Sequence, residues 1–163
     1  MNKTSYSFGY EIYDSADDLN KEDAWLLQHA KETAKAAYAP YSNFYVGAAA
    51  RLINGEIVKG TNQENASYPV GICAERVLLS AAATLHPQVP IESMAVSYRG
   101  ATVKSDHPIA PCGICRQSLA EYELRVHHPI RLILGGMDGK VFIIEKASLL
   151  LPLSFSGSDL HSA

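Results

Sequence analysis

The stretch Ile72–Leu85, ICAERVLLSAAATL, decides how this sequence folds. It is rich in alanine and leucine, which are good helix formers, and it ends just before Pro87, which cannot continue a helix. We therefore predict a buried helix that begins near Gly71. The helix opens with Cys73, one of only three cysteines in the chain.

Strand signals lie on both sides of this helix. We predict strands at residues 44–52, 56–62, 93–99, 130–136 and 140–144. The first two strands flank Asn54-Gly55, a strong hairpin signal, and Asp138-Gly139 marks a later turn. A second helix, CGICRQSLAEYE at residues 112–123, is predicted with Pro111 at its first turn.

The two ends of the chain carry weaker signals. The first ten or so residues show no clear period, and a helix over residues 16–38 is predicted from its helix formers, with Asp14 or Ser15 as the cap and Pro40 as the stop. Its expected buried stripe consists of Leu19, Trp25, Leu26, Ala30, Ala34 and Ala37. A short helix stopped by Pro152 is expected near the C-terminus.

This order of elements predicts an α/β fold. Strands that alternate with helices after an initial hairpin imply a mixed central sheet with helices on both faces, a three-layer α-β-α arrangement. A chain of 163 residues fits one domain, so we expect residues 1–163 to form a single unit, with about residues 1–15 as an irregular extension.

Composition narrows the class of ligand. A formal charge of −3 provides no electrostatic reason to expect nucleic acid as a partner, so a small molecule is the better expectation. No apolar run approaches a membrane span, and the first residues lack the apolar core of a signal peptide, which predicts a cytoplasmic protein without a membrane partner. An odd number of cysteines argues against a disulfide framework.

The cysteines gather at two predicted helix starts. Cys73 and Glu75 open one helix, and Cys112 and Cys115 open the other. Helix N-termini stabilise thiolates, and residues three apart on a helix share a face, so these sulfurs can hold one ion. Three thiolates suit tetrahedral Zn²⁺ and leave its fourth position open, which is typical of a catalytic site.

The open position gives the neighbouring acid a role. Zinc lowers the pKa of bound water towards neutrality, and a carboxylate that is not a ligand, such as Glu75, could accept that proton and deliver it to a leaving group. Three thiolates would weaken zinc as an acid, so Arg76 and Arg116 are expected to donate to sulfur and restore the charge balance.

Two other uses of C-x-x-C stay open at this point. A redox pair would leave Cys73 unexplained. A closed structural zinc site needs a fourth ligand, for which His107 is the candidate, and it would leave Glu75 unexplained.

The pattern CAE followed by PCGIC resembles the zinc-dependent cytidine deaminases, in the form with three cysteine ligands. The resemblance runs from about Lys31 to the end of the chain. It implies hydrolysis of cytidine and 2′-deoxycytidine to the uridine nucleosides with release of ammonia in pyrimidine salvage. It also implies one Zn²⁺ per subunit on Cys73, Cys112 and Cys115, with Glu75 as the catalytic acid and base.

The same resemblance assigns substrate contacts. In the family the residues that hold the ribose lie on the second hairpin strand, and in NQENASY the matching residues are Asn62 and Glu64, with Tyr68 at the end of the segment. Phe44 matches the aromatic beside the pyrimidine, and Ala74 a backbone contact to the base. Phe155 matches an aromatic that reaches a neighbouring subunit, which implies a homotetramer with shared active sites.

Two departures and three alternatives accompany this reading. Leu149 stands where the family often has Glu, and the N-terminal segment is longer than in minimal members, without an assigned role.

A deaminase of a modified nucleoside, such as an aminoacyl-nucleoside antibiotic, shares the zinc core. So does a polynucleotide editor, which the acidic composition disfavours. An inactive zinc-stabilised binding module is the alternative outside catalysis.

Overall fold

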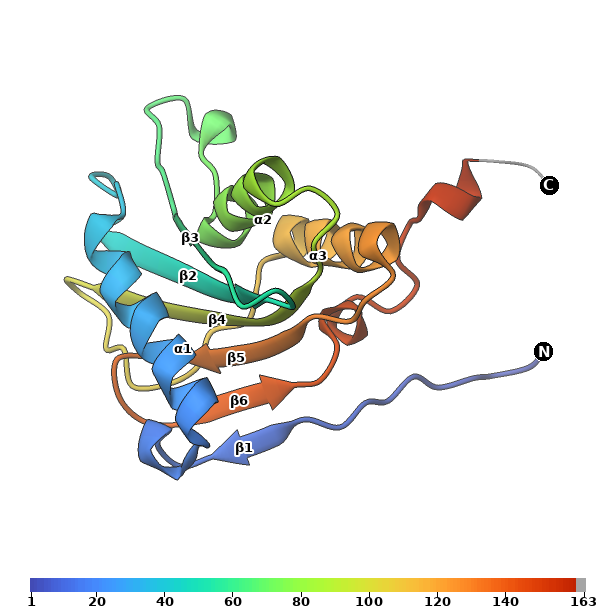
Figure 1. Cartoon of the computed structure of the whole chain (residues 1–163), viewed down its shortest axis with the longest axis horizontal. Coiled ribbons are helices and arrows are strands. Elements are labelled where there is room, and N and C mark those ends of the chain that lie inside the picture. The colour runs from blue at the N-terminus through green and yellow to red at the C-terminus, as the bar shows by residue number, and fades with distance from the viewer. Residues whose placement is uncertain (161–163) are drawn as a thin grey trace.

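A mixed sheet forms the centre of the computed structural model, which describes residues 1–160 (Figure 1). Within those residues the sheet has six strands, in the order β1-β6-β5-β4-β2-β3. β4 and β5 run parallel, and the other neighbouring strands are antiparallel. The strands are Glu11–Tyr13 (β1), Phe44–Leu52 (β2), Ile57–Thr61 (β3), Ile91–Gly100 (β4), Arg131–Gly135 (β5) and Val141–Ile144 (β6).

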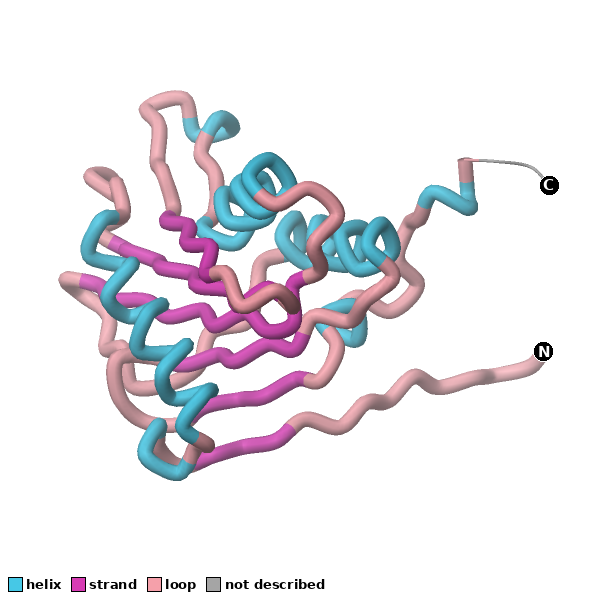
Figure 2. Tube along the Cα trace, in the orientation of Figure 1, coloured by secondary structure: helices cyan, strands magenta, loops and turns pink. Residues whose placement is uncertain are grey.

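Helices cover both faces of the sheet (Figure 2). α1 (Lys21–Thr33) packs on Ala49, Ala95 and Ile133, whereas α2 (Ala74–Leu85) and α3 (Gly113–Val126) pack on residues of the opposite parity. Those residues are Ala48, Ala50, Met94, Val96, Leu132 and Leu134. Since successive strand residues point to opposite faces, the strands from β2 to β6 contribute to both cores, and the predicted three-layer α-β-α fold is confirmed.

The first predicted helix is interrupted. Ser15 caps a 3-10 helix, η1 (Ala16–Asp18), and Asn20 then caps α1 by accepting a hydrogen bond from the backbone N–H of Asp23 at 2.9 Å. The prediction of one helix over residues 16–38 was therefore wrong at its start, because a second capping residue follows the first. α1 ends at Thr33 and a further 3-10 turn, η2 (Ala34–Ala36), follows it.

The buried stripe of α1 also differs from the prediction. Leu26 and Ala30 are buried as expected, but Trp25 is 49% exposed, and Leu27 takes its place against the sheet. Asp23 is buried on the same stripe because its carboxylate pairs with the Arg131 guanidinium at 2.7 Å. Trp25 is two residues from Asp23 and therefore points to a different side of the helix, away from the sheet.

The N-terminal segment is not irregular throughout. β1 pairs with β6, which corrects the prediction for Glu11–Tyr13. Before it, the Tyr10 ring lies 5.1 Å from the Phe142 ring, and the Tyr6 hydroxyl donates to the Leu149 carbonyl at 2.9 Å. These contacts hold the segment along the edge of the sheet (Figure 1).

The other predicted elements are present with shifted ends. The hairpin turns at Gly55, whose φ of +87° requires glycine. α2 begins at Ala74 rather than near Gly71, and α3 begins at Gly113, so Pro111 precedes the helix instead of lying in its first turn. No helix within residues 1–160 is long and apolar enough to cross a membrane.

A glycine in β3 determines how closely α2 approaches the sheet. A Cβ atom on Gly60 would overlap the Ala74 carbonyl oxygen and the Leu78 backbone nitrogen. Both atoms belong to the first turns of α2 and cannot move alone. Gly60 therefore allows the start of α2, with Cys73 and Glu75, to lie directly on β3.

We predict that Gly60→Ala lowers the free energy of unfolding by about 1–3 kcal/mol, because a new methyl group must push the helix away. Zinc affinity should fall as well, since the displaced helix carries one of the cysteines. Thermal unfolding and competition with a zinc chelator would measure both effects. Gly9→Ala is the matched control, because nothing lies within 4 Å of a Cβ at Gly9, and an equal loss in both variants would contradict the prediction.

Candidate metal centre and substrate cavity

The three cysteines meet where α2 and α3 begin. Cys73 is the N-cap of α2, Cys112 is the N-cap of α3, and Cys115 lies in the first turn of α3. Gln63 and Ile72 exchange backbone hydrogen bonds at 2.9 and 3.0 Å, which brings the chain back to the end of β3 before Cys73. The predicted convergence of the three residues is present.

The sulfur positions suit a tetrahedral ion. The Sγ atoms of Cys73 and Cys112 are 3.8 Å apart, those of Cys112 and Cys115 are 3.4 Å apart, and all three lie within 4.8 Å of one another. A zinc–sulfur bond of about 2.3 Å in a tetrahedron requires sulfur atoms about 3.8 Å apart. The three thiols therefore fit one Zn²⁺ through three of its four positions.

The thiols already influence each other's ionisation. A hydrogen bond from Cys115 lowers the pKa of Cys73 to about 6, against the effect of burial, and the charge of Arg76 contributes. The same interaction with Cys73, together with burial, raises the pKa of Cys115. One thiolate is thus available at neutral pH before a metal binds, and it is the one at the start of α2.

Glu75 lies one residue into α2 and is 5% exposed. Burial raises the pKa of its carboxyl group, and hydrogen bonds from its own backbone N–H and from Cys115 oppose that effect. A carboxylate in this setting holds a proton more readily than one in water, which suits a group that must accept and return a proton near neutral pH.

The two arginines differ in their contacts. Arg116 donates from Nε to the Pro111 carbonyl at 2.8 Å and from Nη1 to the Leu150 carbonyl at 3.2 Å. It therefore ties the loop before Cys112 to the C-terminal segment. Arg76 is half-buried beside Cys73, and within residues 1–160 neither guanidinium forms a hydrogen bond with sulfur.

A polar network joins the residues expected to contact the sugar and base. Asn62 follows β3, its Oδ1 accepts from the Val46 N–H at 2.7 Å, and its Nδ2 donates to the Phe44 carbonyl at 2.9 Å. Glu64 accepts from the Tyr41 N–H at 2.9 Å and from the hydroxyl of Ser42. Asn62 thus holds the start of β2, and Glu64 holds the segment that leads into it.

The end of β3 differs from the prediction. Asn62 and Glu64 were predicted on the second hairpin strand, but β3 ends at Thr61. The chain leaves the strand there because Gln63 forms bridges to Tyr38 and Ile72 instead of continuing the pairing with β2. The hydrogen bonds from Tyr41 and Ser42 lower the pKa of Glu64, so its carboxyl group is ionised at neutral pH.

A cavity of about 320 Å³ opens beside this network. Tyr41, Ser42, Glu64, Tyr68 and Gly71 line it, so Tyr68 and Glu64 share a cavity. Tyr68 is 76% exposed and its ring lies 5.9 Å from that of Tyr41. Gly71, one of the residues that line the cavity, lies two residues before Cys73 in the sequence.

The last two predicted site residues lie in different surroundings. Ala74 is fully buried between Cys73 and Glu75 at the start of α2. Phe155 is 58% exposed beyond the 3-10 helix η4 (Ala147–Leu150), and its carbonyl accepts from Gln117 Nε2 at 2.9 Å. Within the single chain its ring therefore faces solvent.

Comparison with known proteins agrees with this geometry. The family model described as "Cytidine and deoxycytidylate deaminase zinc-binding region" matches residues 20–127, more than half of the chain. The chain belongs to this family. Zinc is accordingly the metal of this family, and the cluster of Cys73, Cys112 and Cys115 could hold it.

Individual relatives of this deaminase-family chain are similar over most of their length. A cytidine deaminase from Halalkalibacterium halodurans is 35% identical over 83% of this chain and 96% of its own. One from Mycobacterium tuberculosis is 38% identical over 65% of this chain and 77% of its own. The crystal structure of a Burkholderia pseudomallei cytidine deaminase superposes with a TM-score of 0.71 at 37% identity, over 84% of this chain and all of that one.

Two features of this deaminase-family chain were not predicted from the sequence. Ser42 joins Glu64 to Phe44, because its hydroxyl donates to the carboxylate and accepts from the Phe44 N–H at 3.0 Å. Tyr98 stacks on Phe44, with ring centroids 5.0 Å apart and an interplanar angle of 22°. The shared parity of Tyr98 with Val96 and Met94 could have indicated its face of the sheet.

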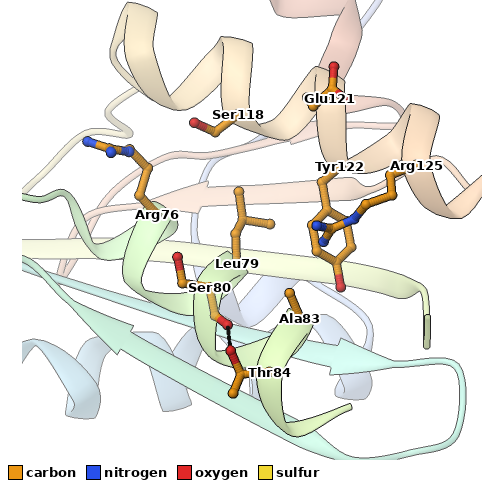
Figure 3. A pocket seen from close by; sticks show the side chains of 9 residues that line it. All are labelled: Arg76, Leu79, Ser80, Ala83, Thr84, Ser118, Glu121, Tyr122 and Arg125. Atoms are coloured by element: carbon orange, nitrogen blue, oxygen red, sulfur yellow. Dashed lines mark hydrogen bonds between the residues drawn. The ribbon is translucent and has the colours of Figure 1, made fainter. Parts of the chain in front are cut away.

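A separate groove of about 480 Å³ lies between α2 and α3, away from the cavity (Figure 3). Small side chains line its middle, among them Ser80, Ala83 and Ser118, and Arg76 and Arg125 lie at opposite ends. Arg125 packs over the Tyr122 ring at 4.5 Å. The groove combines small residues, which permit close approach, with charged residues of both signs, because Glu121 of α3 also lines it.

We predict that Cys73 is the first thiol to be alkylated in zinc-free protein, with a rate that is half-maximal near pH 6, because hydrogen bonding and Arg76 favour its thiolate. Iodoacetamide labelling followed by peptide mass spectrometry would measure this. Cys73→Ser should remove the fast phase, and Arg76→Gln should move the midpoint upward. A midpoint above pH 8 would contradict the assignment.

Proposed function

We propose that this chain catalyses zinc-dependent hydrolytic deamination of cytidine and 2′-deoxycytidine to uridine and 2′-deoxyuridine with release of ammonia. We place the reaction in cytoplasmic pyrimidine salvage, and we propose that residues 1–163 act as a single deaminase domain. The observation that carries the proposal is the set of three sulfurs within 4.8 Å of one another beside the buried Glu75. The relatives named above, which are called cytidine deaminases, support the substrate class.

Glu75 carries the proton transfers in this proposal. Zinc, when bound, supplies a Lewis acid that makes water nucleophilic and stabilises negative charge on the attacking oxygen. Glu75 accepts one proton of the water that attacks C4 and passes it to ring N3, and it then carries the proton of the new C4 hydroxyl to the departing amine, which leaves as ammonia. Its burial excludes bulk water, which would otherwise compete for those protons.

Arg76 and Arg116 support the thiolates in different ways. Three thiolates leave an excess of negative charge around zinc, and the positive charge of Arg76 lies close enough to Cys73 to lower its pKa. Arg116 acts at a distance by holding the Pro111 carbonyl next to Cys112.

The nucleoside would lie between the aromatic and polar groups around the cavity. We assign Phe44 and the backbone of Ala74 to the pyrimidine, and Asn62, Glu64 and Tyr68 to the sugar side. Asn62 keeps one amide hydrogen free, because its oxygen and its other amide hydrogen bind the backbone of β2. That hydrogen and the remaining acceptor capacity of Glu64 match a hydroxyl group that both donates and accepts.

We predict that Glu75→Gln keeps one zinc per subunit but lowers kcat for cytidine by about 10²–10⁴-fold, because an amide cannot accept the proton. Absorbance and ammonia release would follow turnover of cytidine, 2′-deoxycytidine, free cytosine, CMP and blasticidin S, and metal analysis would confirm the zinc content. The wild-type protein should act on both nucleosides and leave free cytosine unchanged.

The same panel separates the alternatives. Turnover of blasticidin S alone would move the chain to antibiotic deamination. Zinc held without any turnover would indicate a binding module, and near-normal activity of Glu75→Gln would remove that residue from the mechanism. Tight, strongly salt-dependent binding of single-stranded DNA or RNA would favour a polynucleotide editor.

We further propose that the chain assembles as a homotetramer with shared active sites, in which Phe155 reaches the site of a neighbour. The exposed Phe155 and Tyr68 rings and the groove between α2 and α3 support this arrangement. The small side chains that line the groove would let a helix of another copy approach closely, and Glu121, which lines the groove with Arg76 and Arg125, would supply the opposite charge for ion pairs across a symmetric contact.

We predict a particle of four chains by light scattering, and complementation between two impaired variants. Phe155→Ala and Glu75→Gln should each show low activity alone. Mixed and reassociated, they should recover activity, because some sites combine an intact Glu75 with an intact Phe155 from another chain. Each variant taken through the same procedure alone is the control, and a monomer that retains full activity would contradict the proposal.

A further inference from the structure

Tyr98 lies directly beneath Phe44 on the face of the sheet that supports α2 and α3. Val46 of β2 pairs opposite Tyr98 of β4, so Phe44 is its diagonal neighbour on the same face. The two rings are nearly parallel, at 22° and 5.0 Å between centroids. Tyr98 is 1% exposed, whereas Phe44 is only partly buried.

The backbone of Phe44 is held from two sides. Its carbonyl accepts from Asn62, and its N–H donates to the hydroxyl of Ser42. These bonds place the Cα atom but leave the ring free to rotate about its side-chain torsions. Within residues 1–160, the aromatic partner of the Phe44 ring is Tyr98.

Tyr98 is itself fixed independently of Phe44. Its hydroxyl donates to the Lys104 carbonyl at 3.1 Å, and the His107 ring lies edge-on at 5.8 Å. The hydroxyl of Ser105 donates to the Tyr98 carbonyl. All three partners belong to the loop that runs from β4 to Cys112, so the ring has little freedom to move.

We propose that Tyr98 is the positioning residue that fixes the plane of Phe44 and thereby sets affinity for the pyrimidine. This inference rests on the proposed function, in which Phe44 contacts the base. Glu75 and the cysteines belong to α2 and α3 rather than to β2 or β4, so the chemical step does not depend on the stack. Loss of the stack therefore weakens substrate binding and leaves the proton transfers in place.

Steady-state kinetics with cytidine test the proposal in Tyr98→Met and Tyr98→Phe. Tyr98→Met keeps an apolar side chain but removes the ring, and should raise KM about fivefold with kcat within about threefold. Tyr98→Phe loses the hydroxyl but keeps the ring, which its burial and the His107 ring still hold, and should leave KM within about twofold of wild type. Zinc content should stay at one per chain in both, and Tyr98→Leu replaces the Met variant if that protein does not fold.

A double-mutant cycle shows whether Tyr98 acts through Phe44. Phe44→Leu should raise KM alone, and adding Tyr98→Met should raise it no further, because the ring to be positioned is already absent. Phe142→Met is the matched control, since it removes a partly buried aromatic from β6, two strands away from β4 in the same sheet, and should leave KM unchanged.

Three results would overturn the inference: an unchanged KM in folded Tyr98→Met, effects of the two substitutions that multiply, or a Tyr98→Phe variant as impaired as Tyr98→Met. Wild-type protein that fails to deaminate cytidine would instead refute the proposed function. Active wild type with an unchanged Tyr98→Met would refute this inference alone.

Discussion

The rest of the structure depends on bringing three thiol groups from two helices to one point. Sulfur atoms within 4.8 Å of one another cannot all carry negative charge unless a cation neutralises them. The free N–H groups at the two helix starts reduce that cost, because Cys73 and Cys112 occupy the N-caps. The sheet must therefore hold the starts of α2 and α3 at the same place.

Several small features of packing meet that requirement. Gly60 lets α2 rest on β3, and the bridge between Gln63 and Ile72 returns the chain to the end of that strand. Arg116 fixes the loop ahead of Cys112 through the Pro111 carbonyl. The same region that brings the cysteines together also holds a residue that we propose contacts the sugar, since Asn62 follows β3 and binds the backbone of β2.

The cavity and the metal centre are thus parts of one arrangement. Asn62, Glu64 and Ser42 stabilise the segment before β2 in the absence of substrate, and Tyr98 supports the ring of Phe44 from below. A site assembled in advance loses less conformational entropy on binding. This explains why residues assigned to the sugar also have structural hydrogen bonds.

The sequence by itself determined the order of β2 to β6 and of the three helices, the three-layer fold and the set of cysteines that meet at one point. Period and turn signals are local, and the spacing of Cys73, Glu75, Cys112 and Cys115 places chemically matched groups at helix starts. It also predicted the hairpin at Gly55, where a single residue type satisfies the backbone.

Only the tertiary structure decided the features that depend on partners distant in sequence. Asp23 faces the core because it pairs with Arg131, which is 108 residues away in sequence but lies beside α1 in space. Trp25 points to another side of the helix. β1 forms because β6 presents a free edge, and Tyr98 meets Phe44 because β2 and β4 are neighbours in the sheet. The propensities of single residues cannot predict such contacts, since each contact depends on how the layers pack.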